Sequence, residues 1–281
     1  MRLALVAVVL LGLAGCSLGR EARLRDAEAI ARAGGLTARE VSAGNFRLLG
    51  FERPSPASAG ARPVLVIYIE GDGRAWLNPW QPSSDPTPSD PIGLRLAASD
   101  PARPLLYLAR PCQFLTDAGC GLRWWTGERL SATVVDAYQQ AIDAAVRRFQ
   151  TERIALVGLS GGGALAALIA ERRRDVAWLV TIAANLDLAA WVRLHDVSPL
   201  SGSLDPASDA TRIADLPQLH LVGGEDRVVP QGIVAGFLAR LPAGAPARLA
   251  VVPGFNHECC WARDWPALLD QIRLLDQIRP D

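Results

Sequence analysis

Residues 154–170 read IALVGLSGGGALAALIA and decide the fold of this chain. The apolar run Ile154 to Val157 predicts a strand buried on both faces, and the Ala/Leu-rich stretch Gly163 to Ala170 predicts a helix. Between them Ser160 stands in the pattern Gly-x-Ser-x-Gly, whose glycines let strand and helix approach closely. The segment therefore predicts a serine at the apex of a sharp turn, above a helix N-terminus that favours negative charge.

Apolar segments on both sides of this turn extend the pattern over the chain. Seven strands are predicted, at Asn45–Glu52, Val64–Glu70, Leu105–Ala109, Ile154–Gly158, Val176–Ala183, Leu219–Gly223 and Ala247–Val252. The predicted helices are Leu130–Phe149, Gly161–Arg172, Gln231–Leu241 and Ala262–Ile278. This alternation indicates an α/β fold, with a mostly parallel sheet and helices on both faces. The irregular stretch 186–216 predicts a short cap insertion.

Length and charge limit the classes of protein that fit. The 281 residues are 50% hydrophobic and 21% charged, which predicts one folded domain and excludes a disordered chain. Because 29 basic and 29 acidic residues cancel, we expect no nucleic-acid partner. We expect a monomer.

The first residues have the pattern of an export signal. Arg2 supplies a positive charge, residues 3–11 are almost wholly apolar, and Leu13-Ala14-Gly15-Cys16 follows. The apolar run is too short to span a bilayer. The small residues ending at Cys16 resemble the bacterial lipobox, whose cysteine is acylated and becomes the new N-terminus. An ordinary secretory signal is the alternative.

The lipobox resemblance implies a signal peptide over 1–15 and a membrane anchor at Cys16. Residues 16–44 then form a tether or an N-terminal helix, and 45–281 form the domain. Ser17 directly follows Cys16. In bacterial lipoproteins, an Asp at this position resembles a signal that retains the protein at the inner membrane. Its absence favours the outer membrane, with the domain facing the periplasm.

Four further cysteines would meet an oxidising compartment after export, where an even number favours disulfides. Cys112 and Cys120 bracket seven residues, a span that a disulfide closes without strain, and we predict that disulfide. The adjacent Cys259 and Cys260 form either a vicinal disulfide or separate bridges to the other two. A zinc site with His257 is the alternative, but the CxxC spacing usual for zinc is missing, and we expect no metal.

A serine hydroxyl needs a general base before it can act as a nucleophile at neutral pH. Of the three histidines, His195 lies in the irregular segment, and His220 lies inside an apolar strand, which favours a structural role. His257 follows the last strand, in a loop that can carry its imidazole to Ser160 at the carboxyl ends of the strands. His257 is therefore the predicted base.

The imidazole needs a carboxylate to orient it. Glu225 and Asp226 follow the strand Leu219–Gly223, in a loop ahead of a helix. We predict Asp226 in this role, with Glu225 as the fallback. The resulting chain order is Ser, Asp, His.

Three motifs in this order, GLSGG at 158–162, GGEDRVVP at 223–230 and PGFNH at 253–257, resemble those of the α/β-hydrolase superfamily. The resemblance covers roughly Asn45 to Ile278 and implies the α/β-hydrolase fold. A phosphate-binding turn is the other interpretation of GLSGG, but the lysine of such a loop is missing.

The same resemblance implies an oxyanion hole, made by the N–H of Gly161 and an N–H of the loop that begins at Glu70. It places the Asp72 N–H in the hole. Relatives often have histidine at the position of Glu70, so Gly71 and Gly73 remain open as donors.

The chain also resembles a set of bacterial lipoprotein hydrolases, through RPCQ at 110–113, WWT at 124–126, NLD at 185–187 and HECCW at 257–261. No chemistry is assigned to these elements. Four tryptophans either line an acyl pocket or pack in the core: Trp76, Trp80, Trp124 and Trp125.

These features together predict a membrane-anchored serine hydrolase with the triad Ser160, His257 and Asp226. We expect a carboxylic ester or related acyl bond in a small-molecule or lipid substrate, and no cofactor. Two alternatives remain: a binding or assembly lipoprotein on the same fold, and an acyltransferase with the same triad.

Overall fold

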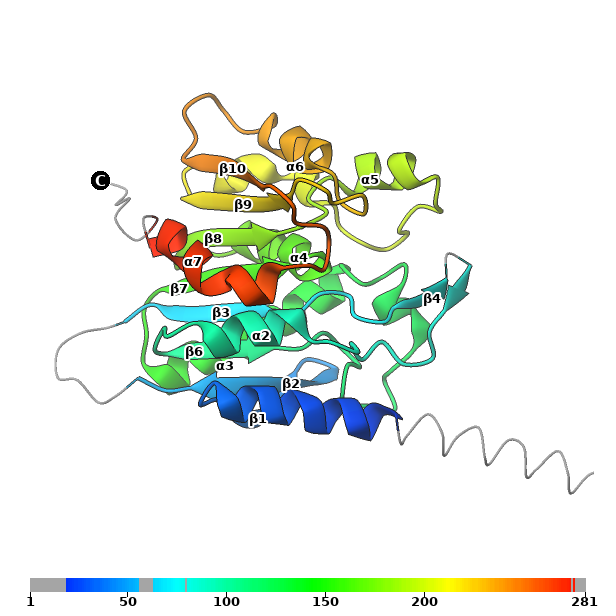
Figure 1. Ribbon diagram of the computed structural model, residues 1–281, viewed down its shortest axis with the longest axis vertical. Coiled ribbons are helices and arrows are strands. Elements are labelled where there is room, and N and C mark those ends of the chain that lie inside the picture. The colour runs from blue at the N-terminus through cyan, green and yellow to red at the C-terminus, as the bar shows by residue number, and fades with distance from the viewer. Residues whose placement is uncertain (1–18, 56–62, 79, 274, 276–281) are drawn as a thin grey trace, which may run out of the picture.

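The computed structural model describes residues 19–55, 63–78, 80–273 and 275, and an eight-stranded sheet forms its centre (Figure 1). The strand order is β1-β2-β6-β3-β7-β8-β9-β10. The strands from β6 to β10 in this order pair in parallel, whereas β1 and β2 are antiparallel. Their bounds are β1 Thr37–Ala43, β2 Phe46–Arg53, β3 Leu65–Ile69, β6 Leu105–Leu108, β7 Ile154–Leu159, β8 Val176–Ile182, β9 Gln218–Gly223 and β10 Ala247–Val252.

All seven predicted strands are confirmed, and five of them are buried on both faces of the sheet. Every residue of β3, β6, β7, β8 and β9 is buried. The sequence analysis missed β1, which lies at the sheet edge with five of its seven residues exposed. A mostly exposed edge strand carries little of the apolar signal that reveals a buried one.

Helices cover both faces of the sheet. One core contains side chains of α3 (Ala132–Phe149), α4 (Gly161–Ala170) and α6 (Gln231–Leu238). The other contains side chains of α2 (Ile92–Ser99), α7 (Trp261–Arg273) and an N-terminal helix over 19–33; α2 and α7 lie on the near face in Figure 1. The α/β prediction is confirmed, although α2 was not predicted.

Shorter elements fill the connections. The segment 186–216, predicted as a cap, contains α5 (Leu188–His195) and the 3-10 turns η2 (Pro206–Ser208) and η3 (Ala210–Ile213). A small hairpin of β4 (Trp76–Asn78) and β5 (Gln81–Pro82) follows β3, and a third 3-10 turn, η1 (Leu122–Trp125), precedes α3.

The helix over 19–33 packs on the domain. Ala27 and Ala31 are buried against the sheet core. Its first turns are fixed by Arg20 and Arg23, which both pair with the buried carboxylate of Asp85. No helix within the described ranges is long and apolar enough to cross a membrane. The predicted signal peptide and Cys16 lie outside these ranges.

A buried carboxyl after α4 predicts a pH-dependent stability. Burial raises the pKa of Glu171 from 4.5 to about 8, and its Oε1 has no hydrogen-bond partner in the described part of the chain. Between these two values the unfolded chain loses the proton and the folded protein keeps it, so stability falls as pH rises. We expect Glu171→Gln to raise the free energy of unfolding by about 2 to 4 kcal/mol at pH 9, relative to its effect at pH 4.

Denaturant unfolding at the two pH values measures this difference. Glu152→Gln is the control, because Glu152 is exposed and lies outside this buried site. An equal effect of Glu171→Gln at both pH values would contradict the prediction.

Candidate active site

Ser160 occupies a sharp turn between β7 and α4. Its backbone angles, φ 50° and ψ −122°, lie in a region that L-residues rarely adopt. A Cβ on Gly158 would lie 2.3 Å from the carbonyl oxygen of Gly162, and a Cβ on Gly162 would lie 2.3 Å from that of Glu70. Glycine is therefore required at both positions, and the turn has the form of a nucleophile elbow.

The structure brings together the three residues predicted as a triad. Ser160 Oγ lies 3.0 Å from His257 Nε2, and His257 Nδ1 lies 2.9 Å from Asp226 Oδ2. Ser160, His257 and Asp226 follow β7, β10 and β9, so the carboxyl ends of three parallel strands of one sheet position them. A proton on Nδ1, donated to Asp226, leaves Nε2 free to accept the serine hydroxyl proton.

Asp226 is held by the backbone of its own loop. Its Oδ1 accepts hydrogen bonds from the N–H groups of Val228 and Val229, each at 2.8 Å. The residue is buried, whereas Glu225 beside it is exposed. The structure therefore places the carboxylate of Asp226, and not that of Glu225, on the imidazole.

The other two histidines have structural contacts. His220 is buried between Thr181 and Gln218, with Nδ1 2.8 Å from the threonine hydroxyl, and burial lowers its pKa to about 3. It is neutral at physiological pH. His195 lies on α5 with Nε2 2.8 Å from the carbonyl oxygen of Val228, in the loop that carries Asp226.

The loop after β3 is fixed by the buried carboxylate of Glu70. This carboxylate accepts hydrogen bonds from the N–H groups of Gly71, Gly93 and Leu94 and from the hydroxyl of Tyr107. Burial raises the pKa of Glu70, and these hydrogen bonds oppose the rise. Because the Gly71 N–H donates to Glu70 at 3.0 Å, it is not available for an oxyanion.

The remaining oxyanion donors lie around Asp72. A Cβ on Gly161 would lie 2.1 Å from Asp72 Oδ1, so the two residues are in contact beside Ser160. Their N–H groups make no hydrogen bond to any described residue. Gly73 has a φ of 61° and packs toward Pro86, as expected for a turn. The Asp72 N–H therefore fits the oxyanion hole best, together with that of Gly161.

Two arginines neutralise the carboxylate of Asp72. Arg110 Nη1 lies 2.9 Å from Asp72 Oδ1, and Arg129 Nε lies 3.1 Å from Oδ2. Both guanidinium groups are buried. One carboxylate and two guanidinium groups leave a net charge of +1, which favours negative charge on a substrate oxygen at Gly161.

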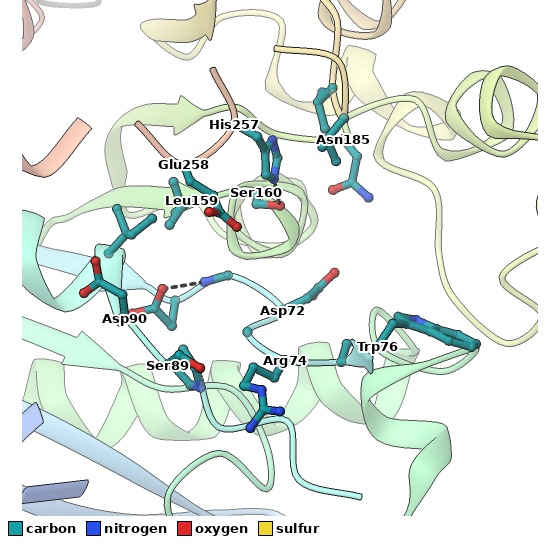
Figure 2. Close-up of a pocket in the computed structure, with 18 of the residues that line it drawn as sticks. Asp72, Arg74, Trp76, Ser89, Asp90, Leu159, Ser160, Asn185, His257 and Glu258 are labelled. Carbon is teal, nitrogen blue, oxygen red and sulfur yellow. Dashed lines mark hydrogen bonds between the residues drawn. The ribbon is translucent and has the colours of Figure 1, made fainter. Parts of the chain in front are cut away.

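A cavity of about 680 Å³ opens over Ser160. Figure 2 shows Ser160, His257 and Asn185 on one side and Asp72 and Trp76 on another. Asn185 is buried, and its Oδ1 has no hydrogen-bond partner among the residues described, so a donor on the substrate would satisfy it.

Of the four tryptophans considered for the pocket, the structure places only Trp76 on the cavity wall. Trp124 and Trp125 are buried in the core, and Trp80 is 87% exposed. Trp191 of α5 also lines the cavity. Its indole donates to the Val228 carbonyl oxygen at 2.8 Å, so α5 contacts the loop that carries Asp226.

Two disulfides are formed, Cys112–Cys120 and Cys259–Cys260. Neither cysteine of the first disulfide lines the cavity over Ser160. Gln113, next to Cys112, donates to the Gly71 carbonyl oxygen at 3.0 Å. Cys259 itself lines the cavity. Within the described residues, no three His, Cys, Asp or Glu side chains converge to hold a metal ion.

Sequence reasoning missed the support around the triad. Glu70 was noted only as a departure from histidine, and Arg129 was not noted. Arg110 and Asn185 stood in motifs to which no chemistry was assigned. The sequence did contain a signal for two of these residues. Arg110 and Asn185 are polar residues just after the buried strands β6 and β8, at the sheet edge that carries Ser160, which indicates a place near the site.

Comparison with known proteins identifies the fold. The chain has the α/β-hydrolase fold, which it shares with many solved structures. No protein-family model matches the sequence, and no curated protein sequence matches it.

Three solved structures illustrate the similarity. A membrane phospholipase A, described as a bacterial virulence factor, is 17% identical with a TM-score of 0.57, over 97% of this chain and 99% of that one. The acylaminoacyl peptidase of Pyrococcus horikoshii is 12% identical with a TM-score of 0.64, over 86% of this chain and 40% of that one. A puromycin-hydrolysing peptidase of Mycobacterium tuberculosis is 15% identical with a TM-score of 0.62, over 86% of this chain and 39% of that one. This chain therefore spans about two fifths of the length of both peptidases.

Proposed function

We propose that this protein is a serine hydrolase that cleaves carboxylic esters. The observation that carries the proposal is the unbroken relay from Ser160 through His257 to Asp226, with distances of 3.0 and 2.9 Å. A partly buried relay of this kind, on the wall of a cavity and beside backbone N–H donors, has the parts that acyl transfer requires.

The proposed reaction begins with attack of Ser160 Oγ on the carbonyl carbon. The hydroxyl proton passes to His257 Nε2, and Asp226 stabilises the imidazolium. The N–H groups of Gly161 and Asp72 hold the oxyanion, helped by the net positive charge of the Asp72–Arg110–Arg129 cluster. The C–O bond then breaks, Nε2 returns the proton to the leaving alcohol, and an acyl-enzyme remains. Water attacks this ester with His257 again as the base, which releases the acid.

An ester substrate is supported by the cavity. Its wall includes the apolar side chains of Ile92, Leu159, Val228 and Trp76, which suit an acyl chain. Membrane phospholipase A, an enzyme of nearly the same length, is named for an ester-cleaving activity. Because two of the similar structures are peptidases, cleavage of an amide bond is the competing proposal.

We further propose that the protein is a lipoprotein, anchored at Cys16 and facing the periplasm, where it acts as a monomer on a small-molecule or lipid acyl substrate. The lipobox-like sequence supports this location. The two disulfides also support it, because disulfides persist mainly in oxidising compartments.

A panel of p-nitrophenyl esters and matched p-nitroanilides, assayed with and without an alcohol acceptor, tests the proposed bond. We expect the esters to give a kcat/KM at least about 100-fold higher than the anilides, because p-nitrophenolate is a better leaving group than the anion of p-nitroaniline. Water should be the main acceptor. Faster cleavage of the anilides would favour a peptidase, and dominant transfer to the added alcohol would favour an acyltransferase.

A further inference from the structure

The β4–β5 hairpin exposes large apolar side chains. Trp76 is 43% exposed, Leu77 is 50% exposed and Trp80 is 87% exposed. We call these three residues the aromatic hairpin patch. Figure 1 shows β4 standing out from the body of the domain. Tryptophan is costly to leave in water, and it is enriched where proteins meet the interface of a bilayer.

The patch is continuous with the mouth of the catalytic cavity. Trp76 lines this cavity, and the chain runs directly from the oxyanion residue Asp72 into β4. The Ala75 carbonyl oxygen accepts a hydrogen bond from the Ser83 N–H at 2.9 Å, which closes the base of the hairpin. The surface that carries the hairpin therefore also carries the entrance to Ser160.

The first turns of the helix over 19–33 are fixed beside the same hairpin. Asp85, three residues after β5, pairs with Arg20 at 3.3 Å and also with Arg23. Cys16 precedes the first described residue, Gly19, by three positions, and three residues span at most about 11 Å. A lipid anchor at Cys16 would therefore hold the hairpin close to the membrane surface.

We propose that the aromatic hairpin patch docks on the lipid surface that anchors Cys16, and that the cavity takes lipid acyl esters from that surface. The inference rests on the proposed lipoprotein anchor and deepens the proposed hydrolase function by naming the source of the substrate. Leu77 and Trp80 enter the headgroup region while Trp76 stays at the cavity wall, which shortens the path of an acyl chain from the bilayer to Ser160.

Tryptophan quenching in vesicles tests the docking. The full-length, acylated chain carries Ser160→Ala, so that no lipid is consumed. It is reconstituted in phosphatidylethanolamine and phosphatidylglycerol vesicles whose acyl chains carry bromine. We expect strong quenching in this parent protein. Leu77→Asp should lower the quenching at least about two-fold, because a carboxylate resists entry into the interface. This variant keeps every tryptophan, so the loss reports withdrawal of the hairpin.

Leu194→Asp is the matched control, since Leu194 is 54% exposed on α5 and Leu77 is 50% exposed on β4. We expect the control to quench like the parent. Equal quenching in the two aspartate variants, or none in the parent, would overturn the proposal. Shielding of Trp80 that depends on protein concentration, without vesicles, would also overturn it and assign the patch to a second copy of the chain.

Turnover of soluble and vesicle-borne esters separates this proposal from the proposed function. In these assays Ser160 is intact. Leu77→Asp should reduce hydrolysis of vesicle phospholipid at least about five-fold and keep hydrolysis of a soluble p-nitrophenyl ester within about two-fold of that of the unsubstituted protein. If the protein that keeps Leu77 shows no quenching although its soluble turnover is normal, only the docking is contradicted. Absence of soluble turnover in the unsubstituted protein contradicts the proposed hydrolase, and an unacylated Cys16 in the mature protein contradicts the anchor.

Discussion

Replacing Ser160 with alanine should lower ester turnover by about 10⁴- to 10⁶-fold, the loss expected when the nucleophile of a triad is removed. Alanine removes Oγ, which lies 3.0 Å from His257 Nε2, and leaves the backbone of the elbow unchanged. The melting temperature should therefore stay close to that of the parent. Steady-state kinetics on a p-nitrophenyl ester, together with a thermal melt, measure both effects.

Ser89→Ala is the control for this substitution. Ser89 lines the same cavity but has no contact with His257, so its loss should change kcat/KM by less than about ten-fold. A Ser160→Ala variant that keeps its activity would exclude Ser160 as the nucleophile.

Replacing Asp226 with asparagine should lower kcat by about 10⁴-fold through the tautomer of His257. Val228 and Val229 both donate N–H groups to Oδ1, so the amide oxygen of asparagine takes that place. The amide NH₂ group then faces His257 Nδ1, which has to accept a hydrogen bond. The proton consequently resides on Nε2, where it prevents removal of the proton of Ser160.

Glu225→Gln makes the same chemical change one residue earlier, on an exposed side chain that does not contact His257. Its kcat should stay within about two-fold of the parent. The pH dependence of kcat adds a second readout, because a tautomer defect persists at every pH. Similar losses of kcat in Asp226→Asn and Glu225→Gln would show that activity depends on the loop as a whole and not on the carboxylate of Asp226.

Local patterns were enough to predict most of the fold. The strands β3, β7 and β8 are continuous apolar runs in the sequence. They are apolar because both faces of each strand are buried. β1 escaped because only Val41 and Ala43 of its side chains are buried. The short β4–β5 hairpin escaped because Trp76 and Leu77 face solvent, which no core pattern predicts.

The reacting residues were predictable because each follows a recognisable strand in the order of a known fold. The residues that hold these side chains and loops in place were not predictable, because their contacts join segments that are distant in the sequence. Glu70 meets the N-terminus of α2, and Arg129 meets Asp72 across 57 positions of the sequence. Asp72 was predicted as a backbone donor, and only the structure shows that its carboxylate needs neutralising.

The most direct test of the central claim is labelling by a fluorophosphonate probe, followed by peptide mass mapping of the full-length protein. An activated serine beside its base forms a stable phosphonyl adduct, whereas an ordinary serine does not. The account predicts a single adduct on the peptide that contains Ser160, and its loss in His257→Ala. An adduct on another residue, or no adduct in the folded parent protein, would contradict it.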